Sequence, residues 1–157
     1  MNQTTQGIVL DQNMVFATTD KNITSFKDIS ARYLVLYFYP KDNTPGCTNE
    51  AKDFTKYFEA FRQLDAEIIG VSRDSIAKHE NFKERYEIPY PLLSDVDEVI
   101  CKHFDVIKQK NFMGRSYLGI DRSTFVLDSN GQCVKEWRNV KVKGHVEAVL
   151  NYLQTAL

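Results

Sequence analysis

The sequence predicts an α/β fold in which a mixed β-sheet is flanked by helices, and two observations lead to this class. Short runs of β-favouring residues alternate with longer segments whose apolar residues recur every three or four positions, which is the βαβα order of a sheet with parallel strands. Near the end of the chain, two strand-like runs flank Asn130-Gly131, which is typical of an antiparallel hairpin. Both kinds of strand pairing in one chain indicate a mixed sheet.

The first strong element is the run Y-L-V-L-Y-F-Y at residues 33–39, which Pro40 closes. Because no charged residue interrupts the run, we expect a central strand that is buried on both faces. A helix should follow, since an apolar stripe runs through residues 48–64. This stripe should cover the sheet, and its members are Ala51, Phe54, Phe58, Phe61 and Leu64.

The middle of the chain continues the alternation. Residues 67–72 (E-I-I-G-V-S) are predicted to form a second buried strand, and residues 75–86 a charged surface helix. An extended segment at 91–93 then leads into a short helix over 96–104.

The last part of the chain should contain a hairpin and a helix. Residues 123–127 and 133–137 are predicted to be its strands, joined by the turn D-S-N-G, and residues 145–153 should form an amphipathic closing helix. The pattern before residue 30 is weaker, and there we expect an initial hairpin formed by residues 14–18 and the segment around Ile23.

Composition places the chain among globular proteins with one domain, residues 1–157. With 20 basic and 21 acidic residues the formal charge is -1, which gives no indication of a nucleic-acid partner. The sequence shows neither a signal-like start nor an apolar stretch of about 18 residues, so we expect no membrane partner and a cytoplasmic location.

Three cysteines, Cys47, Cys101 and Cys133, cannot all pair with one another. No Cys-x-x-Cys and no zinc-type Cys/His spacing occurs, which disfavours a metal site and a thioredoxin-type reductase. Reduced thiols in a reducing compartment fit this pattern best. No glycine-rich phosphate loop or dinucleotide fingerprint occurs, so we expect no cofactor.

The segment Thr44 to Cys47 favours a reactive thiol. Thr44 and Pro45 form a good helix start, because the threonine oxygen can accept a backbone N–H and a proline at the first helical position has no N–H to satisfy. Cys47 then lies in the first turn, where unpaired N–H groups and the helix dipole favour a thiolate. Gly46 should leave room for a small substrate beside the sulfur. A buried structural cysteine at a turn fits the same residues equally well.

Two longer motifs carry a family resemblance. The runs F-Y-P-K-D-N-T-P-G-C-T-N-E-A at 38–51 and R-S-T-F-V-L-D at 122–128 resemble the peroxiredoxins, specifically the Q-type subfamily also called bacterioferritin comigratory proteins. The likeness extends from the strand at 33 to the closing helix. It implies a thioredoxin-like fold and an enzyme that reduces hydrogen peroxide and organic hydroperoxides, as a monomer or weak dimer.

The resemblance also implies a role for each matched residue. Cys47 corresponds to the peroxidatic cysteine, which becomes a sulfenic acid, and Thr44 would hydrogen-bond the reacting peroxide oxygens. Pro40 would shield the sulfur from water, while Arg122 would stabilise the thiolate and polarise the O–O bond. Glu50 would orient the arginine. Only the motif selects Arg122, since the other arginines are equal candidates by sequence alone.

The chain departs from the subfamily where many members carry a second, resolving cysteine. That position, five residues after the first cysteine, is Lys52 here, and the helix predicted over 75–86 contains no cysteine either. Cys101 and Cys133 are better explained as core residues, although both stay open as resolving partners. We therefore expect recycling by an external thiol from thioredoxin, glutaredoxin or a low-molecular-weight thiol.

Two other functions also involve a reactive cysteine. A Cys–His hydrolase would need one of His79, His103 or His145, but each is expected to be a surface or helix-capping residue. A non-enzymatic peroxide sensor or chaperone-like protein on the same fold stays open, because sensing and turnover both begin with oxidation of Cys47.

Overall fold

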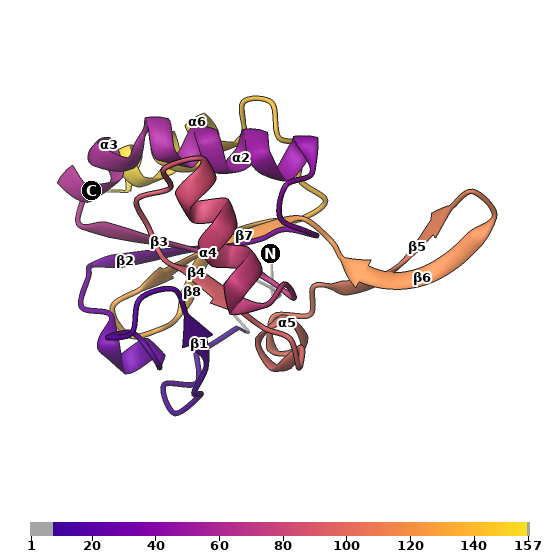
Figure 1. Cartoon of the computed structure of the whole chain (residues 1–157). Coiled ribbons are helices and arrows are strands. Elements are labelled where there is room, and N and C mark those ends of the chain that lie inside the picture. Colours follow the sequence, from indigo (N-terminus) through magenta and orange to yellow (C-terminus); the bar gives the residue numbers. More distant parts are fainter. Residues whose placement is uncertain (1–7, 157) are drawn as a thin grey trace.

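The computed structural model describes residues 8–156, and within them the chain forms a six-stranded mixed sheet (Figure 1). The strand order is β1-β4-β3-β2-β7-β8. Strands β2, β3 and β4 are parallel, whereas β7 is antiparallel to both β2 and β8, and β1 is antiparallel to β4. The predicted mixed sheet is confirmed. Its strands are β1 (Ala17–Thr18), β2 (Tyr33–Phe38), β3 (Ala66–Ser72), β4 (Leu92–Ser94), β7 (Ser123–Asp128) and β8 (Cys133–Trp137).

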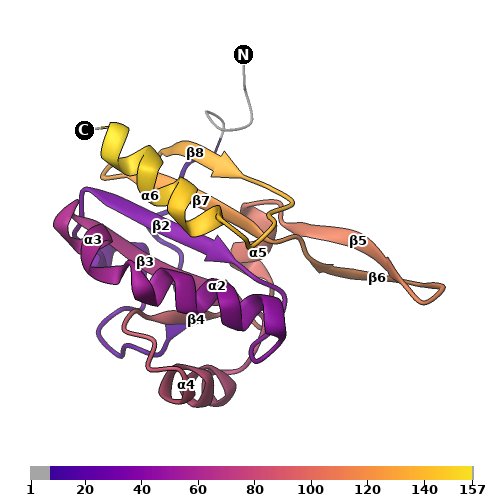
Figure 2. The same ribbon diagram turned by 90° about the horizontal axis from the view of Figure 1, so that it is seen from above.

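Helices cover both faces of this sheet (Figure 2). Helices α2, α3, α4 and α6 pack on one face, where they bury Phe54, Phe61, Phe82 and Val149. Phe104, at the end of α5, is buried on the other face. The helices are η1 (Phe26–Asp28), α2 (Pro45–Lys56), α3 (Phe58–Gln63), α4 (Ile76–Arg85), α5 (Val99–His103) and α6 (His145–Thr155).

Strand β2 lies at the centre of both cores. Val35 and Tyr37 point into the core under α2, while Leu36 and Phe38 point into the core under α5, and all four are at most 1% exposed. Side chains alternate across a strand, so an uninterrupted apolar run is what a strand covered on both faces requires. The prediction for residues 33–39 is confirmed.

The apolar stripe at residues 48–64 forms two helices and not one. Helix α2 already begins at Pro45, and the helical path breaks at Tyr57, where φ is -100° and ψ is 11°. Just before this break, the Thr55 hydroxyl donates to the Ala51 carbonyl at 2.8 Å, a bond of the kind that bends helices. Phe54 and Phe61 are buried on either side, so the stripe still covers the sheet.

The later strands and helices form where the sequence predicts them, within a few residues at each end. The expected initial hairpin is only partly correct. The Phe16 N–H donates to the Thr24 carbonyl at 2.8 Å, but Ala17–Thr18 pairs with β4 and so becomes an edge strand of the main sheet.

A second hairpin was not predicted. Strands β5 (Ile107–Phe112) and β6 (Arg115–Ile120) form a separate two-stranded sheet that projects away from the rest of the molecule (Figure 1). Met113 and Gly114 make the turn, with φ values of 50° and 79°. Positive φ at both central residues is typical of a tight hairpin turn, but methionine rarely adopts it, so Met113-Gly114 is a weak turn signal.

Within residues 8–156, none of the helices combines the length and apolar character that a membrane span requires.

Substitution of Gly70 tests how closely the central strands pack. A Cβ at this position would lie 2.9 Å from the Tyr37 ring and 3.0 Å from Leu92 Cδ2, and both side chains are fully buried. We expect Gly70→Ala to lower the free energy of unfolding by about 1–3 kcal/mol, measured by urea denaturation. Gly119→Ala is the matched control, because there the new Cβ meets Tyr117 and Lys110, whose ends can move toward solvent. Equal losses in the two variants would contradict this account.

Candidate active site

Cys47 lies in the first turn of α2, directly after the loop that leaves β2, and its side chain is 1% exposed. Thr44 is the N-cap residue and Pro45 the first helical residue, as predicted. The predicted capping bond is wrong, because the Thr44 hydroxyl instead donates to the Lys41 carbonyl at 3.1 Å. Thr44 makes no side-chain cap bond to the first turn, so in residues 8–156 the turn's N–H groups are not satisfied by its N-cap side chain and can favour a negative charge at Cys47.

The sheet places Arg122 beside this turn. Phe38 at the end of β2 pairs with Ser123 at the start of β7, so Arg122 lies next to the chain that leaves β2. Its Nη2 donates to Cys47 Sγ at 3.4 Å, and its Nη1 donates to Glu50 Oε1 at 2.7 Å. One guanidinium therefore bridges a sulfur and a carboxylate that are 75 and 72 residues distant from it in the sequence.

Glu50 lies three residues after Cys47 on the same side of α2 and is fully buried. Its Oε1 accepts from Arg122, but its buried Oε2 has no hydrogen-bond partner within the part of the chain that the structure describes. Burial raises the pKa of Glu50 to about 7, although the charge of Arg122 opposes the shift. Burial by itself would lower the pKa of Arg122, but the negative charges of Glu50 and Cys47 outweigh it and raise that pKa.

The absence of a side chain at Gly46 makes room for the guanidinium of Arg122. A Cβ at Gly46 would lie 3.1 Å from Arg122 Nη2, the same nitrogen that donates to Cys47. The expectation that the absent side chain also leaves space for a substrate stays a prediction. Pro40 and Thr44, both half-buried, lie in the loop before α2.

A buried network of hydrogen bonds fixes the loop between β2 and α2. Asp42 Oδ2 lies 2.7 Å from Nδ1 of His79 on α4, and the Tyr39 hydroxyl donates to Asp42 Oδ1 at 2.6 Å. The backbone N–H of Asp42 donates to Asp74 Oδ2 at 2.9 Å, which ties the loop after β2 to the loop after β3. His79 Nε2 lies 3.0 Å from the Leu93 carbonyl. Both ring nitrogens thus face oxygen atoms of the protein, which fixes the orientation of the ring.

The prediction that His79 is a surface residue is therefore wrong, since its side chain is fully buried. Asp42, Asp74 and His79 place ligand atoms within 4.8 Å of one another, as a metal site would. However, both imidazole nitrogens already face protein oxygens, so the cluster is better explained as the support of the loop.

The other two histidines make hydrogen bonds elsewhere. His145 begins α6 as predicted, but it is only 6% exposed, and its Nε2 lies 2.8 Å from Thr124 Oγ1. Burial lowers the pKa of His145 to about 4, so the surface assignment is wrong here too. His103 is exposed, and its Nε2 bonds to the Val9 carbonyl at 2.8 Å. None of the hydrogen bonds found for these rings within residues 8–156 reaches Cys47.

Cys101 and Cys133 are core residues, as predicted, at 0% and 2% exposure. Both lie in the core under α5, whereas Cys47 lies in the core on the opposite face of the sheet. Burial raises the pKa of Cys101 far above its usual value and that of Cys133 to about 12. Lys52, at the position of the missing cysteine, is exposed, with its Nζ 5.6 Å from the centre of the Tyr86 ring.

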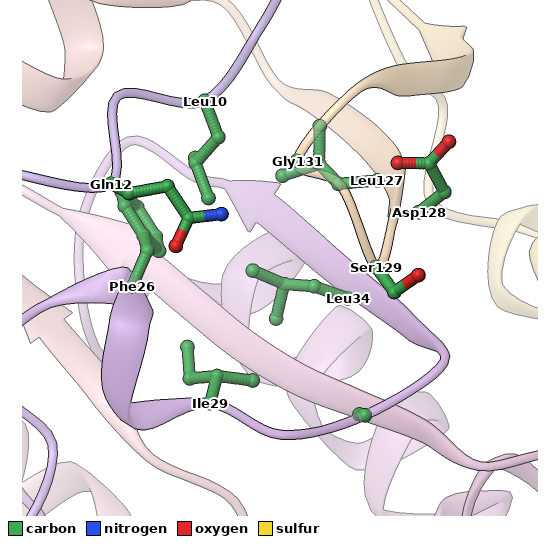
Figure 3. Close-up of a pocket in the computed structure, with 10 residues that line it drawn as sticks. Leu10, Gln12, Phe26, Ile29, Leu34, Leu127, Asp128, Ser129 and Gly131 are labelled. Atoms are coloured by element: carbon green, nitrogen blue, oxygen red, sulfur yellow. The ribbon is translucent and has the colours of Figure 1, made fainter.

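A pocket at the other end of the sheet is separate from this site (Figure 3). Its lining includes Leu34 at the start of β2 and Leu127 near the end of β7, whereas Cys47 follows the other end of β2. Leu10 and Phe26 also line it, and neither a cysteine nor a histidine does.

Comparison with known proteins agrees with the geometry around Cys47. Residues 9–135 match the AhpC/TSA family. Peroxiredoxin Bcp of Bacillus subtilis is 53% identical over 127 residues, 81% of each chain, and that of Xanthomonas campestris is 50% identical over 131 residues, 83% of this chain and 82% of that one.

Solved structures resemble the whole fold. A cysteine-to-serine variant of Xanthomonas campestris Peroxiredoxin Q superposes with a TM-score of 0.90 at 43% identity, covering 98% of this chain and 99% of that chain. Another structure, of the Xanthomonas campestris bacterioferritin comigratory protein, is described for alkyl peroxide reduction activity, and it has a TM-score of 0.87 at 44% identity, covering 95% and 98%. The predicted thioredoxin-like fold is confirmed. The chain therefore belongs to the AhpC/TSA family and, within it, to the thiol peroxidases of the peroxiredoxin Q/Bcp type.

Proposed function

We propose that the protein reduces hydrogen peroxide and alkyl hydroperoxides through Cys47 and that an external thiol recycles it. The observation that carries this proposal is the contact of Arg122 with Cys47 Sγ at 3.4 Å, in the uncapped first turn of α2. A fixed cation and free N–H groups stabilise a thiolate, which is the nucleophilic form of cysteine.

In the first step the Cys47 thiolate attacks one oxygen of the O–O bond. The S–O bond forms as the O–O bond breaks, and the leaving oxygen takes a proton to become water or an alcohol. Negative charge is spread over sulfur and both oxygens in this transition state, so preorganised donors stabilise it strongly in a water-poor site. We assign this role to Arg122 and to Thr44, assign shielding of the sulfur to Pro40, and assign Glu50 to the orientation of Arg122.

In the second step an external thiol attacks the sulfenic acid and releases water. The resulting mixed disulfide is broken by a second thiol, which returns Cys47 to its starting state. Lys52 at the usual resolving position supports this route, as does the sheet that lies between Cys47 and the other two cysteines. We propose thioredoxin, glutaredoxin or a low-molecular-weight thiol as the reductant, and a monomer or weak dimer as the working form.

We also propose a reducing compartment such as the cytoplasm, because all three cysteines are free thiols in the structure.

The one-cysteine mechanism predicts opposite results for two variants. Cys47→Ser should abolish peroxide consumption, whereas the double variant Cys101→Ala/Cys133→Ala should retain steady-state turnover with a thioredoxin system or dithiothreitol. A sensor would oxidise once and stop, so sustained turnover also separates enzyme from sensor. Mass spectrometry of the peroxide-treated wild type under non-reducing conditions provides the check. A stoichiometric disulfide between Cys47 and either other cysteine would contradict the mechanism.

Removal of the guanidinium should slow the oxidation of Cys47. Arg122→Gln is expected to lower the second-order rate constant for peroxide by roughly 10²-fold or more, because one donor to the transition state is lost. Stopped-flow measurement of a single oxidation isolates this step from recycling. Arg32→Gln is the control, since Arg32 lies before the start of β2 and stacks on Tyr33. A rate within twofold of wild type for Arg122→Gln would remove Arg122 from the mechanism.

The buried carboxylate predicts a pH dependence of stability. The pKa of Glu50 is raised from 4.5 to about 7 in the folded protein, so folding favours its protonated form. This contribution is full below pH 4.5 and is lost as the pH rises through about 7. Relative to Glu50→Gln, the wild type should therefore lose on the order of 2 kcal/mol of unfolding free energy across that interval.

Urea denaturation at several pH values between 4 and 8 measures this difference. Glu59→Gln removes an exposed glutamate of α3 and should follow the wild-type profile. Parallel profiles for wild type and Glu50→Gln would show that Glu50 does not bind its proton more tightly in the folded state.

A further inference from the structure

The β5–β6 hairpin exposes large apolar side chains that no other part of residues 8–156 covers. Phe112, Met113, Tyr117 and Leu118 are 67%, 86%, 50% and 65% exposed. The hairpin projects from the sheet in two perpendicular views (Figures 1 and 2), so its outer half has no supporting core. A two-stranded ribbon is only marginally stable in water, and a concentration of exposed apolar residues indicates an interaction surface.

One face of this hairpin combines aromatic and basic side chains. The antiparallel register pairs Lys110 with Tyr117 and Phe112 with Arg115, and directly paired residues point to the same face. Lys108 shares that face but contacts Asp105 at 3.1 Å. The hairpin sequence I-K-Q-K-N-F-M-G-R-S-Y-L-G-I contains no carboxylate, in a chain whose formal charge is -1. The surface is thus locally cationic on a nearly neutral protein.

The base of the hairpin borders the reactive cysteine. Strand β6 ends at Ile120, two residues before Arg122. Lys110 lies within electrostatic range of Asp121 and Arg122, the residues that follow β6. A strand of this length spans about 20 Å, so a protein lying along the hairpin would extend from its tip to Cys47.

We propose that the cationic aromatic face of the β5–β6 hairpin is the docking surface for the protein that reduces Cys47. This inference rests on the proposed external-thiol mechanism, and it assigns the partner's chemistry: a small thiol-bearing redox protein with acidic and apolar groups around its reactive cysteine. The charges steer the encounter, and the apolar side chains supply contact area. Transient redox complexes bury roughly 600 Å² or less on each partner, which a hairpin face can provide.

Two other occupants fit less well. A second copy of the chain that docked hairpin to hairpin would bring like charges together, which opposes association. An anionic membrane would attract the same cations and accept the apolar tip, but it supplies no thiol to Cys47.

The test separates reduction by a protein from reduction by a small molecule. The variants are Phe112→Ser and Arg115→Glu, which lie opposite each other near the tip. Lys21→Glu is the matched control, because Lys21 lies beside Pro89 and Pro91 at the other end of the sheet. Stopped-flow experiments measure the oxidation of Cys47 by hydrogen peroxide, and then the reduction of the sulfenic acid by dithiothreitol, by a bacterial thioredoxin and by a glutaredoxin.

We expect each hairpin variant to lose about tenfold in the rate constant with thioredoxin or glutaredoxin, and Arg115→Glu to weaken the salt dependence of that rate. Oxidation by peroxide and reduction by dithiothreitol should stay within twofold of wild type. The inference is overturned if the protein reductants act on the variants at the wild-type rate, or if the rate with dithiothreitol falls equally.

Three further outcomes also overturn it. The first is recycling of the wild type by dithiothreitol but by neither protein, which leaves the proposed peroxidase function intact. The second is hairpin-dependent dimerisation in sedimentation experiments, and the third is hairpin-dependent binding to phosphatidylglycerol vesicles, each without an effect on protein reduction. Absence of peroxide consumption with every thiol would instead refute the proposed function itself.

Discussion

The site depends on one guanidinium that contacts the sulfur of Cys47 and the carboxyl group of Glu50 at once. Arg122 donates through Nη1 to Glu50 and through Nη2 to Cys47, and Gly46 is the residue that gives it space to do so. A planar fork with separate donors can hold both partners in fixed directions, which a lysine ammonium could not. The main sheet makes this contact possible, because the β2–β7 register places Arg122 beside the first turn of α2.

The loop that carries Pro40 and Thr44 is held in place by a few buried polar groups around Asp42. Asp42 accepts hydrogen bonds from Tyr39 and faces His79, while its backbone binds Asp74. Tyr39 directly follows β2, His79 lies in α4, and Asp74 lies in the loop after β3, so three parts of the chain determine where the loop lies. A peroxide site requires such rigidity, because displaced donors stabilise a transition state poorly.

The sequence predicted the elements well where one local signal dominates, as in the unbroken apolar run of β2 and the Asn130-Gly131 turn. The predictions were wrong where contacts between residues that are distant in the sequence determine the structure. The burial of His79 depends on Asp42 and Leu93, and periodicity among charged neighbours on α4 could not reveal either. The β5–β6 hairpin was missed because its strands face solvent and its turn uses methionine at positive φ. Within the site, a motif match alone selected Arg122.

The charge balance of the site also explains why an unsatisfied carboxylate oxygen can persist there. Burying Glu50 is unfavourable, and its Oε2 has no partner among residues 8–156, but its Oε1 gives the buried guanidinium of Arg122 a carboxyl partner. Oxidation to the sulfenic acid removes the negative charge from the sulfur. In the mechanism that we propose, Glu50 would still accept from Arg122 at that stage, so the cation would keep its place while Cys47 is oxidised. A residue whose burial is unfavourable would thereby keep the proposed site assembled through the catalytic cycle.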